Sequence, residues 1–281
     1  MRQKILSFTV FGQNIAIYTY GTMIVLAFLL GAWWVRRNAA RTLEIDRERS
    51  FNVAFALLFL GLGGARLAFS FAHYGEFAQT PMKFLKIWEG GLVQLGGVVA
   101  RLLWLWWWLP KHAELKGFAF LDLLSRGACL AFALGWTAPL LAGDDFGRPT
   151  ALPWGIPVGA FEDGTPVATW ATGHDALARL HPTQVYESLL ALALFFLVGA
   201  FAKRARVTGR ATAAFLMLYA VGRGLLDLTR GDAGPSPAYA DRGFVIDGVL
   251  SWTQFLALGV FFAGLALWLI RRPSDDRPRT A

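Results

Sequence analysis

Long apolar runs alternate with short polar stretches along nearly the whole chain. Each run approaches or exceeds the roughly 20 residues that an α-helix needs to cross the apolar core of a bilayer. Seven such windows can be drawn, over residues 15–35, 51–72, 92–109, 118–142, 183–202, 211–229 and 246–270. The pattern predicts an all-α integral membrane protein with seven transmembrane helices, built as a single polytopic membrane domain over residues 1–281.

Composition and charge sharpen this prediction. Hydrophobic residues make up 56% of the 281 positions and charged residues only 16%, as expected of a membrane protein rather than a soluble domain. Lys and Arg concentrate in the loops that follow the odd-numbered windows, for example at Arg36, Arg37, Lys203 and Arg204. The positive-inside rule then places the N-terminus outside and the C-terminus in the cytoplasm. The net charge of +8 is explained by this topology, and no nucleic-acid partner is expected.

Residues 143–182 form the longest stretch between two windows. The segment is rich in Gly, Pro, Thr and Trp and contains no run long enough to span a membrane. We expect it to form a loop subdomain at the outer face, where loops that dock substrates are commonly found.

A polar heptapeptide, His181-Pro-Thr-Gln-Val-Tyr-Glu187, stands directly before the fifth window. Proline suits the first turn of a helix, so this stretch predicts a helix N-terminus. Free backbone N–H groups and the helix dipole favour an anion there, which suggests a phosphate-bearing partner beside His181, Thr183 and Gln184. The same composition is also common at membrane interfaces without any further function.

Charged residues inside the apolar windows are the second candidate for chemistry. An arginine at membrane depth costs roughly 3 kcal/mol or more unless it finds a partner or water. Arg66 therefore lies in a polar cavity or is paired, and the cavity is the favoured prediction. Steps of four and seven residues place Arg223, Asp227 and Arg230 on one stripe of a helix. The alternative is an Arg–Asp pair that only fastens helices together.

Several kinds of chemistry receive no support. The patterns GxxxxGK[ST], HExxH, GxSxG and GxGxxG are absent, so nucleotide, zinc and α/β-hydrolase sites are not predicted. The single cysteine, Cys129, falls in the fourth window and is expected to be a small buried side chain. No metal or organic cofactor is expected.

Taken in order, the distinctive stretches resemble the bacterial prolipoprotein diacylglyceryl transferases. The matching pieces are Tyr20-Gly21, Gly63-Gly-Ala-Arg66, Trp88-Glu-Gly-Gly with Gly96-Gly97, Gly143-Asp to Gly147-Arg-Pro-Thr150, Pro153-Trp154, His181-Pro-Thr-Gln-Val-Tyr-Glu187, and Gly222-Arg223 with Asp227. They cover nearly the whole chain, and the ordered set is specific although each piece is short.

The resemblance implies transfer of the diacylglyceryl group of phosphatidylglycerol to the thiol of a lipobox cysteine, at the outer face of the bacterial cytoplasmic (inner) membrane. Phosphatidylglycerol, the signal-peptide region of a prolipoprotein and membrane lipids are the implied partners. By resemblance, Arg223 stabilises the departing phosphate and Asp227 holds Arg223 in place. The catalytic candidates are Arg223, Asp227, Asp144, His181 and Glu187. The candidates for lipid or phosphate binding are Arg66, Tyr20, Gly147, Arg148, Gln184 and Tyr186.

Five positions depart from the family pattern, and two of them, Asp144 and Asp227 in place of glutamates, keep the charge. Leu95 stands where the family has a histidine, and Trp136 and Pro139 stand where it has an arginine and an asparagine. Three interpretations stay open. The first is a divergent transferase in which Asp144, Glu187 or His181 transfers the proton. The second is a related lipid-modifying membrane enzyme with a different acceptor, and the third is a lipid-binding homologue without catalysis.

Overall fold

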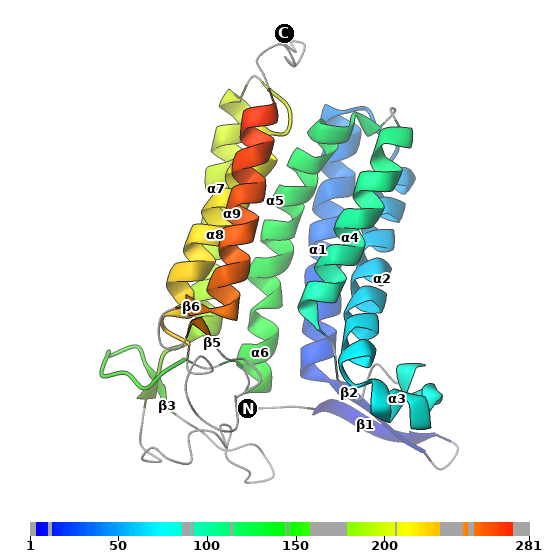
Figure 1. The fold of residues 1–281 in the computed structure, drawn as a ribbon, viewed down its shortest axis with the longest axis vertical. Coiled ribbons are helices and arrows are strands. Elements are labelled where there is room, and N and C mark those ends of the chain that lie inside the picture. Colours follow the sequence, from blue (N-terminus) through cyan, green and yellow to red (C-terminus); the bar gives the residue numbers. More distant parts are fainter. Residues whose placement is uncertain are drawn as a thin grey trace. The chain divides into compact units, whose positions relative to one another are not determined.

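The protein is predominantly helical in its computed structural model (Figure 1). The structure describes residues 4–10, 13–85, 91, 93–112, 115–143, 145, 147–157, 179–205, 207–230, 244–246 and 250–271, with the backbone alone for residues 4–10, 13–17, 94, 244–246 and 252. The long helices are α1 (Thr19–Thr42), α2 (Arg47–Ala72), α4 (Gln94–Trp108), α5 (Gly117–Gly135), α7 (Thr183–Arg204), α8 (Arg210–Asp227) and α9 (Trp252–Ile270). The short helices are α3 (Tyr74–Gln79), η1 (Pro81–Leu85), η3 (Leu109–Lys111) and α6 (Thr137–Ala142).

Five helical stretches among the described residues are long and apolar enough to cross a membrane. They are Thr19–Thr42, Arg47–Ala72, Gly117–Ala142, Thr183–Arg204 and Thr253–Ile270. The other two predicted windows also form helices, α4 and α8. However, α4 has only 15 residues, and the 18 residues of α8 include three charged side chains, Arg210, Arg223 and Asp227.

Short antiparallel strand pairs connect some of the helices, so the expected all-α class holds for the long elements only. Strand β1 (Lys4–Val10) pairs with β2 (Gln13–Tyr18) ahead of α1. Strand β3 (Ile156–Pro157) pairs with β4 (Arg179–Leu180), and β5 (Phe244–Ile246) pairs with β6 (Leu250–Ser251). Backbone groups outside a helix need hydrogen-bond partners, and strand pairing supplies them. Most of the predicted 143–182 loop subdomain, including residues 158–178, lies outside the described residues.

The chain divides into two compact units, and each is described by itself. The small unit comprises residues 32–123, and the large unit comprises residues 1–31 and 124–281.

Helices α2 and α4 pack closely in the small unit because glycines face each other. A Cβ atom added at Gly64 would lie 2.5 Å from Ala100 Cβ and 2.6 Å from the Gly96 carbonyl oxygen. Such distances mean that the two backbones approach each other where a side chain would stand, as in small-residue contacts of membrane helices. The Gly-rich stretch before Arg66 therefore allows α2 and α4 to approach closely.

Helices α7, α8 and α9 lie side by side in the large unit (Figure 1). A buried cluster joins α7 and α8 to α5, and its members are Cys129, Leu194, Val198, Ala211 and Phe215. Cys129 is 0% exposed, which confirms the prediction of a small buried side chain.

The three helices of the large unit alternate in direction. An Arg223–Glu187 ion pair joins the end of α8 to the start of α7. At the opposite end, the guanidinium of Arg210 donates to the carbonyl of Arg271 at 3.3 Å, joining the start of α8 to the end of α9. The alternation therefore brings the polar residues at the start of α7, the end of α8 and the start of α9 together at one end of the bundle.

We expect Gly64→Ala to lower the free energy of unfolding by about 1–3 kcal/mol, the usual cost of overpacking a close contact. Gly63→Ala is the matched control, because a Cβ at Gly63 meets no atom within 4 Å. Thermal unfolding of the purified protein in detergent measures both. Equal midpoints for the two variants would contradict the close α2–α4 contact.

Candidate functional site

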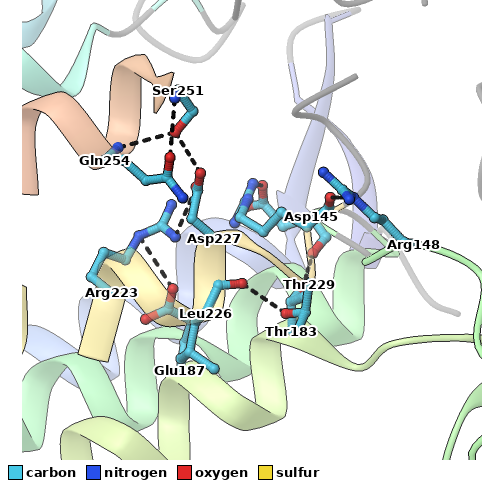
Figure 2. A network of polar contacts seen from close by, with 11 residues as sticks. Asp145, Arg148, Thr183, Glu187, Arg223, Leu226, Asp227, Thr229, Ser251 and Gln254 are labelled. Atoms are coloured by element: carbon cyan, nitrogen blue, oxygen red, sulfur yellow. Dashed lines mark hydrogen bonds and ion pairs between the residues drawn. The ribbon is translucent and has the colours of Figure 1, made fainter. Parts of the chain in front are cut away.

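Arg223 is placed between two carboxylates near the end of α8 (Figure 2). Its Nε lies 3.2 Å from Glu187 Oε1, and its Nη1 lies 3.3 Å from Asp227 Oδ1. Asp227 follows one helical turn after Arg223, so the sequence spacing alone brings them together. Glu187 comes from the second turn of α7 and joins the pair only through the packing of the two helices. Arg223 Nη2 makes no hydrogen bond to the described part of the chain.

Glu187 depends on Arg223 to a degree unusual for a buried carboxylate. Its side chain is 1% exposed, and neither of its oxygens has a hydrogen-bond donor among the described residues. The contact with Arg223 is an ion pair without hydrogen-bond geometry. Since burying an uncompensated charge is costly, this pair ties the position of Glu187 to that of the guanidinium.

Asp227 is held from the other side by Ser251, the residue that caps α9. The Ser251 hydroxyl donates to Asp227 Oδ2 at 2.5 Å and accepts a hydrogen bond from the Gln254 N–H at 3.0 Å. Gln254 Oε1 in turn accepts from the Ser251 N–H at 3.1 Å. Ser251 was not among the site residues predicted from the sequence. The Ser-x-x-Gln spacing ahead of an apolar run is a capping-box signal that would have placed it at the helix start.

Arg230 lies beyond α8 and faces Asp145. The predicted stripe of Arg223, Asp227 and Arg230 is therefore wrong for its third member. The helix ends at Asp227 and tightens into i→i+3 hydrogen bonds, with the Arg230 N–H donating to the Asp227 carbonyl at 3.1 Å. Arg230 Nη2 lies 2.5 Å from Asp145 Oδ1, while the Thr183 hydroxyl donates to the Asp145 carbonyl at 2.5 Å.

Gly147 and Arg148 connect this ion pair to the segment before α7. The Gly147 N–H donates to the His181 carbonyl, and the Arg148 N–H donates to the Thr229 carbonyl, each at 2.9 Å. A Cβ at Gly147 would lie 2.5 Å from both His181 Cβ and the Thr229 carbonyl oxygen, so only glycine fits. Arg148 is exposed, and its Nε donates to the Arg230 carbonyl at 2.9 Å.

His181 is oriented by two aromatic side chains. Its Nδ1 lies 3.2 Å from the hydroxyl of Tyr186, which also accepts a hydrogen bond from Trp154 Nε1 at 2.8 Å. The indole can only donate, so the tyrosine oxygen is fixed as its acceptor. His181 Nε2 makes no hydrogen bond to the described residues, and the side chain is half-buried.

Arg66 belongs to the small unit and is bonded to backbone carbonyls. It is 4% exposed, and its guanidinium donates to the carbonyls of Phe84 at 3.1 Å, Gly91 at 3.0 Å and Lys83. Of the two alternatives for this arginine, pairing with backbone carbonyls therefore describes it better than the favoured polar cavity. The physical reason is that carbonyls of an irregular segment and a buried guanidinium satisfy each other. Its predicted contact with a lipid headgroup stays a prediction.

The remaining predicted residues are dispersed. Tyr20 is 45% exposed in the first turn of α1, and Gln184 is 0% exposed in the first turn of α7. Asp144 lies outside the described residues. Among the described residues, no group of three or more His, Cys, Asp and Glu side chains could hold a metal ion.

Leu95 and Pro139, two of the expected departures from the family pattern, lie in helices. Leu95 is 48% exposed near the start of α4. Trp136 stands between α5 and α6, and Pro139 is buried within α6. None of these side chains can supply the charge or the proton acceptor that the family pattern has there.

Comparisons with known proteins identify the family of the chain. The sequence model of the prolipoprotein diacylglyceryl transferase family matches residues 7–270. A phosphatidylglycerol–prolipoprotein diacylglyceryl transferase of Legionella pneumophila is 29% identical over 264 residues, which are 91% of this chain and 93% of the relative. The enzyme of the same description from Nitratidesulfovibrio vulgaris is 28% identical over 256 residues, 90% of this chain and 88% of the relative. A match of this extent shows that the chain belongs to the prolipoprotein diacylglyceryl transferase family.

Proposed function

We propose that the protein transfers the diacylglyceryl group of phosphatidylglycerol to the cysteine thiol of a prolipoprotein, with Arg223 stabilising the phosphate that leaves. Membership of the family supports the reaction. The single observation that supports a reaction site at Arg223 is the pair of buried carboxylates that hold this cation. They contact Nε and Nη1, and Nη2 makes no hydrogen bond to the described residues.

The charge change in the reaction explains why a fixed cation is needed. The thiolate sulfur forms a bond to the glyceryl carbon, and the bond between that carbon and the phosphate oxygen breaks. The electron pair stays with glycerol 1-phosphate, so a phosphodiester with one negative charge becomes a monoester approaching two. A cation that is already oriented stabilises the developing charge without reorganising during the step.

The helix ends around Arg223 add to this stabilisation. Helices α7 and α9 both begin at the end of the bundle where Arg223 lies. Helix N-termini carry partial positive charge and favour an anion. The leaving phosphate would therefore meet Arg223 and two favourable dipoles, as expected from the polar stretch before α7.

The thiol also needs a proton acceptor, because Leu95 replaces the family's histidine. Of the described candidates, Glu187 is only 1% exposed, whereas His181 is half-buried with Nε2 unbonded to the described residues. We assign proton acceptance to His181, oriented by Tyr186 and Trp154. Glu187 then serves to hold Arg223.

We further propose seven spans, with α4 and α8 crossing the bacterial cytoplasmic membrane in addition to the five candidate helices. Lys203, Arg204, Arg210 and Arg271 lie at the end of the α7–α9 bundle opposite Arg223. The positive-inside rule puts this basic end in the cytoplasm, so Arg223 faces the outer side. The lipobox of an exported prolipoprotein is available on that side.

Purified protein in vesicles with headgroup- and glyceryl-labelled phosphatidylglycerol and a lipobox peptide tests the reaction. We expect glyceryl label on the peptide and free glycerol phosphate. Headgroup release without peptide labelling would favour a related enzyme with another acceptor. Lipid binding without turnover would favour a lipid-binding homologue, since Leu95 and Trp136 remove a candidate base and a cation.

In this assay Arg223→Ala should lower kcat by about 10²–10³-fold, the usual effect of losing one oriented donor to a developing anion. Arg204→Ala is the control, because Arg204 is exposed at the basic end of α7. Unchanged turnover in Arg223→Ala with an intact fold would remove this residue from the reaction.

His181→Gln should lower kcat by about 10²–10⁴-fold near neutral pH, the range for loss of a general base. Its activity should recover as pH rises toward the pKa of about 8.5 of a free thiol, because the thiolate then forms without help. His73→Gln, at the exposed end of α2, serves as control. A pH profile parallel to wild type would contradict the assignment.

The topology predicts which introduced cysteines are reached from outside. In a Cys129→Ala background, an impermeant maleimide should label Ala78→Cys in intact spheroplasts and Lys203→Cys only after permeabilisation. The opposite pattern would invert the proposed orientation.

A further inference from the structure

The N-cap of α9 bonds to the carboxylate that holds Arg223. We propose that Ser251 is a positioning residue for this reaction: by fixing Asp227 it directs the guanidinium of Arg223 toward the leaving phosphate. This inference rests on the proposed function of Arg223 and adds to it a residue from a third helix.

The hydrogen bonds of Ser251 show that its hydroxyl hydrogen is donated to Asp227. A serine hydroxyl has one hydrogen to donate and two lone pairs that accept. The Gln254 N–H, 3.0 Å away, can only donate, so it occupies a lone pair. The single hydrogen is then available for Asp227 Oδ2 at 2.5 Å. The capping box of α9 therefore presents an oriented donor to the carboxylate.

Asp227 needs such a donor in order to hold Arg223 in one direction. The terminal torsion of an aspartate is broad, so a carboxylate bonded on one oxygen alone can rotate. Here Ser251 engages Oδ2 and leaves Oδ1 facing Arg223 Nη1 at 3.3 Å. Both Asp227 and Ser251 are 3% exposed, so water does not substitute for either contact. Figure 2 shows the sequence of contacts from Gln254 through Ser251 and Asp227 to Arg223.

The guanidinium is thereby held at two of its three nitrogens by residues of different helices. Glu187 on α7 faces Nε, and Asp227 on α8, fixed from α9, faces Nη1. Only the Nη2 edge stays available for the phosphate. Because the phosphate gains charge as the carbon–oxygen bond breaks, a misdirected guanidinium affects the transition state more than substrate binding.

The test compares three variants in vesicles with labelled phosphatidylglycerol and a lipobox peptide. Ser251→Ala should lower kcat by about 10- to 100-fold, the range for a hydrogen bond to a charged group, with KM for phosphatidylglycerol within about twofold of wild type. Ser251→Thr keeps the hydroxyl and should restore kcat to within about threefold. Gln254→Ala weakens the capping box but leaves the Ser251–Asp227 bond, so its kcat should stay close to wild type.

Thermal unfolding in detergent separates positioning from capping. Both Ser251→Ala and Gln254→Ala should lower the unfolding midpoint through the weakened cap, while only the former lowers kcat. A kcat that falls equally in these two variants, or a Ser251→Thr variant as slow as Ser251→Ala, would show that Ser251 only caps α9. Unchanged kcat in Ser251→Ala would also overturn the inference. If Arg223→Ala lowers kcat by about 10²–10³-fold in the same assay, the proposed function stands in each of these cases.

Discussion

The cost of placing a guanidinium in an apolar bundle governs this structure. Arg223 carries a charge that lipid cannot solvate, and its two carboxylate partners are themselves almost fully buried. None of the three charges is stable there without the others, because removing one partner leaves an uncompensated ion. The charged groups that we assign to the reaction therefore also hold the end of α8 to the start of α7. The same ion pairs form the site and stabilise the packing of these two helices.

In the small unit, buried arginines donate to backbone carbonyls of the described residues. Arg66 donates to the backbone carbonyls of an irregular segment, and Arg101 Nε donates to the Leu57 carbonyl at 2.9 Å within the α2–α4 contact. Carbonyls satisfy a cation but do not neutralise it, and here they serve to hold backbone segments in place. Carboxylates set at two nitrogens of Arg223 leave a third for a ligand.

The sequence could predict features that depend on residues close together along the chain, but not contacts between separate helices. Apolar windows predicted the long helices, and the four-residue spacing predicted the contact of Arg223 with Asp227, since both depend on neighbours along the chain. The prediction that Arg230 shares a helix face with Arg223 and Asp227 was wrong because it assumed that the helix continues past Asp227. The contacts of Glu187 and Ser251 with this pair come from other helices, so no local pattern contains them. The prediction favoured a cavity at Arg66 because the sequence does not show that the carbonyls of residues 83, 84 and 91 lie beside this side chain.

The burial of Cys129 matters because the reaction transfers a lipid to a thiol. An enzyme that alkylates thiols carries a potential acceptor in every cysteine of its own chain, and a lipid attached there would be permanent. This chain has one cysteine, 0% exposed and packed against α7 and α8. Burial among apolar side chains keeps this thiol away from solvent, so a residue that packs like ordinary core also reduces the chance that the enzyme modifies itself.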